Sequence, residues 1–188
     1  MTTTINTTEY ALMAGAAYDS TRDDQNKAPY PESFGWNPIK GELNHRVVDS
    51  SGFEARTFIR ESDNAIVISY AGTYFPQSAD LVADIAIGAG FAHNQLLQAA
   101  RYYQDVKKWA IAQGYSADNI SFTGHSLGGG LAALMGVFFN KKAVVFDEAP
   151  LQLSFVGRIS YLRNPPNKKF SINDEVFNIS TLLTQEVA

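Results

Sequence analysis

The chain has 188 residues, no cysteine and a formal charge of −4 at pH 7. Its 45% hydrophobic and 18% charged residues can bury a core, which excludes the disordered, fibrous and low-complexity classes. The absence of cysteine excludes a disulfide scaffold, and the mild acidity offers no basic surface for nucleic acid. The length predicts a single domain over residues 1–188.

The N-terminus predicts no cleaved signal and the chain predicts no membrane span. Met1–Thr8 is polar and lacks the basic and apolar regions of a secretory signal peptide. No apolar run approaches the roughly 20 residues that a transmembrane helix needs. We therefore expect a protein that is exported without a cleaved signal, with a cytoplasmic location as the alternative.

In the first half of the chain, apolar periodicity predicts a helix over Thr8–Asp19. Asp23–Gly41 is rich in proline and polar residues, which indicates a surface loop. Two strands follow at Arg46–Asp49 and Glu54–Ile59, and the β-branched run Ala65–Tyr70 is typical of a buried central strand.

In the second half, an amphipathic pattern predicts a long helix over Asn94–Ala112. A strand at Asn119–Thr123, an apolar helix at Leu127–Phe139, and strands at Ala143–Phe146 and Lys169–Ile172 follow. Strands that alternate with helices predict an α/β fold with a mostly parallel sheet.

The most informative segment is residues 124–128, which read Gly-His-Ser-Leu-Gly. In a G-x-S-x-G elbow the serine lies on a strained turn between a strand and a helix, and the glycines let the two elements approach closely. Here a strand is predicted before Gly124 and a helix after Gly128, so Ser126 is a candidate nucleophile. The alternative is a glycine-rich connection without chemistry. No phosphate-binding loop motif is present.

An ester hydrolase also needs donors for the oxyanion that forms in the transition state. The backbone N–H of Leu127, directly after the serine, is one candidate. The loop Ala71-Gly72-Thr73-Tyr74 follows the central strand and could provide a second donor through Thr73. An ordinary turn is the equally plausible alternative for this loop.

A carboxylate should orient the base of such an enzyme. Asp174 follows the predicted strand Lys169–Ile172, while Asp147 follows the strand Ala143–Phe146. Glu175 is a third candidate, and position in the sequence alone separates them little. No cluster with the spacing of a metal or calcium site is present, so neither a metal nor another cofactor is expected.

The chain resembles the class 3 (fungal-type) lipases, and most closely the secreted bacterial phospholipase A1 enzymes of that superfamily. The resemblance rests on five segments in this order: EYALMAGAAYDS, VISYAGT, TGHSLGGGLAALM, VFDEAP and INDEVF. It implies an α/β-hydrolase fold, Ser126 as nucleophile, Thr73 in the oxyanion hole and Asp174 as the acid.

The resemblance further implies cleavage of an acyl ester of a glycerophospholipid at a lipid surface, through an acyl-enzyme. Some similar enzymes leave the cell without a cleaved signal, and some are made with a small accessory or inhibitor protein. The segment Tyr74–Ala92 corresponds to the lid of similar lipases; a helix packed on the sheet is the alternative for it.

The chain departs from the family pattern at the base, because no histidine follows Asp174. The histidines present are His45, His93 and His125, for which packing, capping or surface hydrogen bonding is the expected role. We therefore expect the chain to lack a C-terminal part that carries the base, or to receive a histidine from another chain. The alternatives are a catalytically silent lipase-fold module that binds a protein or lipid, and a general carboxylesterase.

Overall fold

A computed structural model describes residues 4–18, 31–72, 89–148, 169–172 and 175–178. The chain divides into two compact units, residues 1–150 and residues 151–188. The assignment of all 188 residues to one domain remains a prediction from the sequence.

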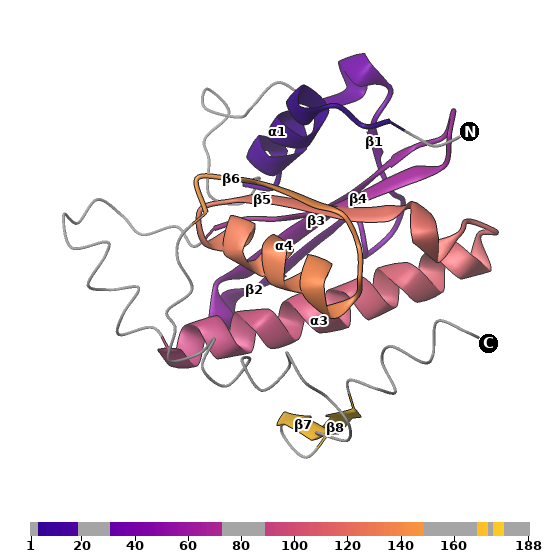
Figure 1. The fold of residues 1–188 in the computed structure, drawn as a ribbon. Coiled ribbons are helices and arrows are strands. Elements are labelled where there is room, and N and C mark those ends of the chain that lie inside the picture. The colour runs from indigo at the N-terminus through magenta and orange to yellow at the C-terminus, as the bar shows by residue number, and fades with distance from the viewer. Residues whose placement is uncertain (1–3, 19–30, 73–88, 149–168, 173–174, 179–188) are drawn as a thin grey trace. The chain divides into compact units, whose positions relative to one another are not determined.

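The first unit is built on a six-stranded sheet (Figure 1). Its strands follow the order β1-β3-β4-β5-β6, and β2 pairs with β3 beside β1. The strands are β1 (Asn37–Pro38), β2 (His45–Val48), β3 (Phe53–Arg60), β4 (Ala65–Tyr70), β5 (Ile120–His125) and β6 (Ala143–Phe146).

The sheet is mixed, which corrects the expectation of a mostly parallel one. β1, β2 and β4 each pair with β3 antiparallel, whereas β4, β5 and β6 run parallel to one another. The connections explain the difference, because short turns such as the one at Asp63 and Asn64 can join only antiparallel neighbours. The parallel half begins where helices connect the strands.

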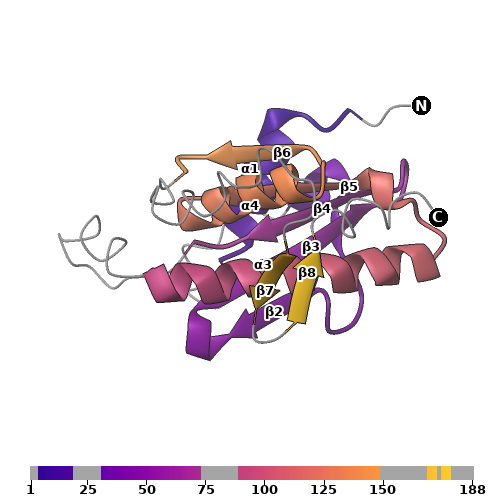
Figure 2. The same ribbon diagram turned by 60° about the horizontal axis from the view of Figure 1, so that its bottom comes forward.

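Helices cover both faces of this sheet (Figures 1 and 2). α1 (Thr7–Ala16) packs on β4, β5 and β6 from one side, whereas α3 (Ala89–Ala112) and α4 (Leu127–Phe138) pack on the other. Short 3-10 helices lie at Pro31–Phe34, Asp49–Ser51 and Ala117–Asn119. None of the described helices is both long and apolar enough to cross a bilayer.

The N-terminal helix is anchored by a buried glutamate. Asn6 caps α1, and its side chain and that of Glu9 form a reciprocal capping box. Glu9 also accepts a hydrogen bond from the Trp36 indole at 3.1 Å and pairs with Arg60. Trp36 is fully buried, so the described end of the predicted surface loop contributes to the core instead.

The central strand β4 is buried at all six positions and separates two apolar layers. Val67 packs in the cluster beneath α1, with Met13 and Phe58. On the opposite face Tyr70 packs against Phe53 and Phe122, and its hydroxyl donates to the Ala99 carbonyl of α3. This alternation follows the two-residue period of a strand.

The remaining elements differ from the predictions mainly at their ends. α3 begins at Ala89 rather than Asn94, so the last residues of the proposed lid form its first turn, while residues 74–88 lie outside the described residues. In the second unit β7 (Lys169–Ile172) and β8 (Glu175–Asn178) form an antiparallel pair. The sequence pattern predicts β7 but not β8.

Candidate active site

Ser126 lies between the carboxyl end of β5 and the first residue of α4. Its backbone adopts φ 56° and ψ −127°, in the left-handed half of the conformational map where a non-glycine residue is strained. Such strain costs on the order of 1–3 kcal/mol and persists only where the surroundings enforce it. The structure therefore shows the sharp strand-to-helix turn that the elbow motif requires.

The two glycines that flank the serine are enforced by backbone contacts. A Cβ placed on Gly124 would collide with the carbonyl group of Gly128 and lie 2.8 Å from the carbonyl oxygen of Tyr70. A Cβ on Gly128 would collide with that same oxygen and lie 2.7 Å from the carbonyl carbon of Ala71. No side-chain rotation relieves these contacts, so β4, β5 and α4 can meet only with glycine at both positions.

Backbone hydrogen bonds hold the turn in place. The Ser126 N–H donates to the Phe146 carbonyl of β6 at 3.1 Å, and the Gly130 N–H donates to the Ser126 carbonyl at 3.1 Å. Leu127 opens α4, where the first N–H groups of a helix have no intrahelical acceptor. The positive end of the helix dipole thus lies directly behind the serine.

The loop after β4 lies against the elbow. A Cβ on Gly72 would lie 3.0 Å from the His125 carbonyl oxygen and 3.3 Å from the Ser126 Cβ. The Ala71 N–H donates to the Glu54 carbonyl at 2.9 Å, which fixes the start of the loop. Thr73, the predicted second oxyanion donor, lies outside the described residues.

Tyr18, just beyond the C-terminal end of α1, joins the loop to the elbow. Its hydroxyl accepts the Gly72 N–H at 2.9 Å and donates to the His125 carbonyl, 3.2 Å away. The His125 Nδ1 is a third neighbour of this hydroxyl, at 3.1 Å. Because the Gly72 N–H is already bound, any oxyanion donor of this loop must come from a later residue.

The sequence pattern marks Tyr18 only as a helix residue. The spacing of the tyrosine carried no signal, because its partners lie 54 and 107 residues away. Its place at the end of a segment shared with lipases was the one available pointer.

Two of the histidines have described side-chain partners. The His125 ring contacts Tyr18 and lies 4.0 Å from the Asp147 carboxylate, and it is about half exposed. His45 Nε2 lies 2.7 Å from the carboxylate of Glu54, a buried residue. His93 lies inside α3 rather than at its start. No hydrogen bond joins His45 or His125 to Ser126 among the described residues.

The candidate acids fall in different parts of the chain. Asp147 follows β6 with a positive φ of 42°, and its side chain is 95% exposed. Asp174 lies outside the described residues, and Glu175 begins β8 in the second unit. The choice of Asp174 as the acid therefore remains a prediction.

Among the described residues, no group of three acidic or histidine side chains lies close enough together to hold a metal ion. The elbow itself offers a hydroxyl, a helix N-terminus and a neighbouring loop. Such a constellation can form and stabilise a tetrahedral acyl adduct.

Most of the chain is similar in sequence to a known lipase. A protein of Eremothecium gossypii named as a lipase, ATG15, is 28% identical over 196 residues, which cover 83% of this chain. The chain spans only 35% of that relative's length.

Two lipases of known structure are also similar. Lip2 lipase from Yarrowia lipolytica is 18% identical, with a TM-score of 0.51 over 88% of this chain and 66% of Lip2. Lipase II from Rhizopus niveus is 17% identical, with a TM-score of 0.49 over 84% of this chain and 67% of that lipase.

The match to Lip2 confirms the α/β-hydrolase fold. The family model for the Tle-like phospholipase domain matches residues 9–172, a range that includes the elbow, the Gly72 loop and β7. The chain therefore belongs to the phospholipase-like family, as a Tle-like phospholipase domain within the lipase superfamily.

Proposed function

We propose that this chain is a serine ester hydrolase domain that removes the first acyl chain of a glycerophospholipid, with Ser126 as the nucleophile. The observation that carries the proposal is the strained backbone of Ser126 at the N-terminus of α4, with Gly72 packed against it. Strain of this kind costs stability, and strained residues cluster at active sites and ligand-binding sites.

In the proposed reaction the Ser126 hydroxyl oxygen attacks the ester carbonyl carbon, and its proton passes to a base. The N–H of Leu127 and donors from Thr73 stabilise the oxyanion. The ester C–O bond then breaks, and the departing alcohol of the lysophospholipid takes the proton from the base. Water hydrolyses the acyl-serine by the same route and releases a fatty acid.

The proposed base is an imidazole that comes from outside these 188 residues and is oriented by Asp174. His125 is a poor candidate because its Nδ1 faces Tyr18 and its Nε2 faces Asp147. His45 is hydrogen-bonded to Glu54. Without a base, a serine hydrolase keeps only the residual catalysis of its binding site and oxyanion donors.

Chemical rescue tests this proposal directly. The 188-residue chain is assayed on phospholipid vesicles labelled at the first or the second acyl position, with and without free imidazole in the buffer. Turnover should rise in proportion to the imidazole concentration, at the first position, and Ser126→Ala should abolish the rise. Ser116→Ala, at an exposed serine that caps a 3-10 helix, is the matched control and should behave as the unmodified chain.

If imidazole raised the turnover of Ser126→Ala as much as that of the unmodified chain, Ser126 would be excluded as the nucleophile. Vesicle binding with no turnover at any imidazole concentration would favour the silent lipid-binding module. Cleavage of short soluble esters but not of vesicles would favour a general carboxylesterase.

Export without a cleaved signal and an accessory or inhibitor protein belong to the same proposal, because both follow from the resemblance to secreted phospholipases. The relatives named above come from fungi, whereas the enzymes that the sequence resembles most are bacterial, so the export route rests on the resemblance alone. Detection of the protein in culture medium with its N-terminal residues intact would support export of this kind.

A further inference from the structure

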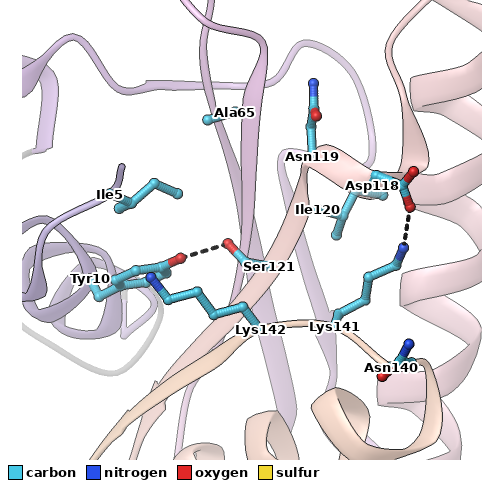
Figure 3. Close-up of a pocket in the computed structure, with 10 residues that line it drawn as sticks. All are labelled: Ile5, Tyr10, Ala65, Asp118, Asn119, Ile120, Ser121, Asn140, Lys141 and Lys142. Atoms are coloured by element: carbon cyan, nitrogen blue, oxygen red, sulfur yellow. Dashed lines mark hydrogen bonds and ion pairs between the residues drawn. The ribbon is translucent and has the colours of Figure 1, made fainter. Parts of the chain in front are cut away.

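A pocket lies at the amino ends of the parallel strands β4, β5 and β6 (Figure 3). Its volume is about 540 Å³, within the range of small-molecule sites. Ile120 and Ser121 line it from the amino end of β5, whereas Ser126 follows the carboxyl end of that strand. At about 3.3 Å per residue, the two ends of β5 lie roughly 16 Å apart.

The pocket carries an excess of positive charge. Lys141, Lys142 and Asp118 contribute its charged side chains, and the Lys141 ammonium is paired with the Asp118 carboxylate at 3.0 Å. The Lys142 ammonium instead lies over the Tyr10 ring, 5.1 Å from its centroid. Within the described part of the chain no carboxylate pairs with Lys142. The two lysines and the one aspartate therefore give the lining of the pocket a net charge of +1.

The neighbouring hydroxyls cannot neutralise that charge. Tyr10 donates its hydroxyl to the Ser121 Oγ at 2.9 Å, and burial raises its pKa, so the phenol stays neutral at physiological pH. The amides of Asn119 and Asn140 also line the pocket and can donate hydrogen bonds to an anion.

The remaining wall is apolar. Ile5, Ala65 and Ile120 line the pocket beside the charged groups. Inorganic phosphate as a dianion would leave one negative charge without a partner and, because it has no aliphatic stem, would gain nothing from these side chains. A single negative charge on an aliphatic stem satisfies both parts of the wall.

We propose that this pocket binds an aliphatic carboxylate, with the carboxylate at Lys142 and the stem against Ile5 and Ile120. The assignment rests on the pocket alone and holds whether or not Ser126 is a nucleophile. If the proposed hydrolysis occurs, the released fatty acid belongs to this chemical class, and the pocket would then be a second site for the product.

Titration of the isotopically labelled 188-residue chain with octanoate, followed by nuclear magnetic resonance, tests the proposal. The amide signals of Asn119, Ser121 and Lys142 should shift along one saturation curve. Lys142→Met should weaken binding by about five- to tenfold, while Lys142→Arg should change it by less than about twofold. Lys108→Met, at an exposed lysine of α3, is the matched control and should leave binding unchanged.

Two further ligands separate the charge from the stem. Octanol lacks the charge and should bind at least about fivefold more weakly than octanoate. Inorganic phosphate lacks the stem and should also bind more weakly. Equal binding of phosphate with the same dependence on Lys142 would overturn the carboxylate assignment. Octanoate shifts confined to Gly124 and Leu127, or insensitive to Lys142→Met, would overturn the site itself.

Discussion

The two ends of β5 differ in the kind of contact that they make with their neighbours. At the carboxyl end Gly124 and Gly128 lie so close to backbone atoms that neither position admits a side chain, and the Ser126 N–H donates to the Phe146 carbonyl of β6. At the amino end Ser121 and its neighbours meet Tyr10, Lys141 and Lys142 through side chains and leave a pocket. The carboxyl end is thus determined by backbone geometry and the amino end by side-chain chemistry, so the two should respond differently to mutation.

The largest expected effect is at Gly128. The substitution Gly128→Ala drives a Cβ into the Tyr70 carbonyl, so it should cost at least about 3 kcal/mol of the free energy of unfolding. Urea denaturation measures this. Gly41→Ala is the control, since its φ is +89° with open space around it, and strain alone should cost about 1 kcal/mol. Equal losses in the two variants would show that backbone collision does not govern the elbow.

Tyr18→Phe should come next, because it removes the only side-chain hydroxyl that joins the Gly72 loop to the elbow within the described residues. The expected loss is about 1–3 kcal/mol, the cost of leaving buried partners unsatisfied. Amide hydrogen exchange should speed up at Gly72 and leave Ser121 unchanged. Unchanged exchange at Gly72 would show that the loop does not depend on this tyrosine.

The stability of the protein at alkaline pH should depend on two buried tyrosines, Tyr10 near the amino end of β5 and Tyr70 near its carboxyl end. Burial raises the pKa of Tyr10 and raises that of Tyr70 well above its ordinary value of 10.0. The unfolded chain ionises first, so the stabilisation is complete below pH 10 and is lost as the pH rises towards the folded-state pKa. Each tyrosine should contribute a slope of about 1.4 kcal/mol per pH unit there.

Unfolding measured between pH 8 and 11.5 checks this. Tyr70→Phe should flatten the pH dependence over a wider range than Tyr10→Phe, since Tyr70 has the larger shift. If the free energy of unfolding of Tyr70→Phe and Tyr10→Phe depended on pH in the same way, the two ends of β5 would not differ in the burial of their tyrosines.

The smallest expected effect is a gain in stability when the strain at Ser126 is relieved. Ser126→Gly should be more stable than Ser126→Ala by about 1 kcal/mol, because glycine adopts a φ of 56° without strain. The melting temperature measures the difference. Asn140→Gly, before β6, relieves a similar φ of 50°, but asparagine tolerates this conformation, so the gain there should be smaller. An equal gain at both positions would mean that Ser126 is not unusually strained.

The prediction from sequence succeeded where the signal was local. The buried strand β4 and the turn around Ser126 were both identified, because β-branched runs and glycine spacing report directly on backbone geometry. The strand β8 was not predicted, because its four residues are too few to show a strand pattern in the sequence. Trp36 was placed in a surface loop, because prolines around it indicated a loop and nothing indicated its contact with Glu9.

The strand, turn and helix of the elbow follow from the local sequence, because G-x-S-x-G and the flanking apolar pattern act over fewer than twenty residues. The Tyr18 junction and the pocket at Lys142 depend instead on how distant segments pack together. Their partners lie far apart along the chain, as with Tyr10 and Ser121 at a separation of 111 residues. Such pairs form only when α1 packs on the sheet, and no local pattern encodes which side chains that packing brings together.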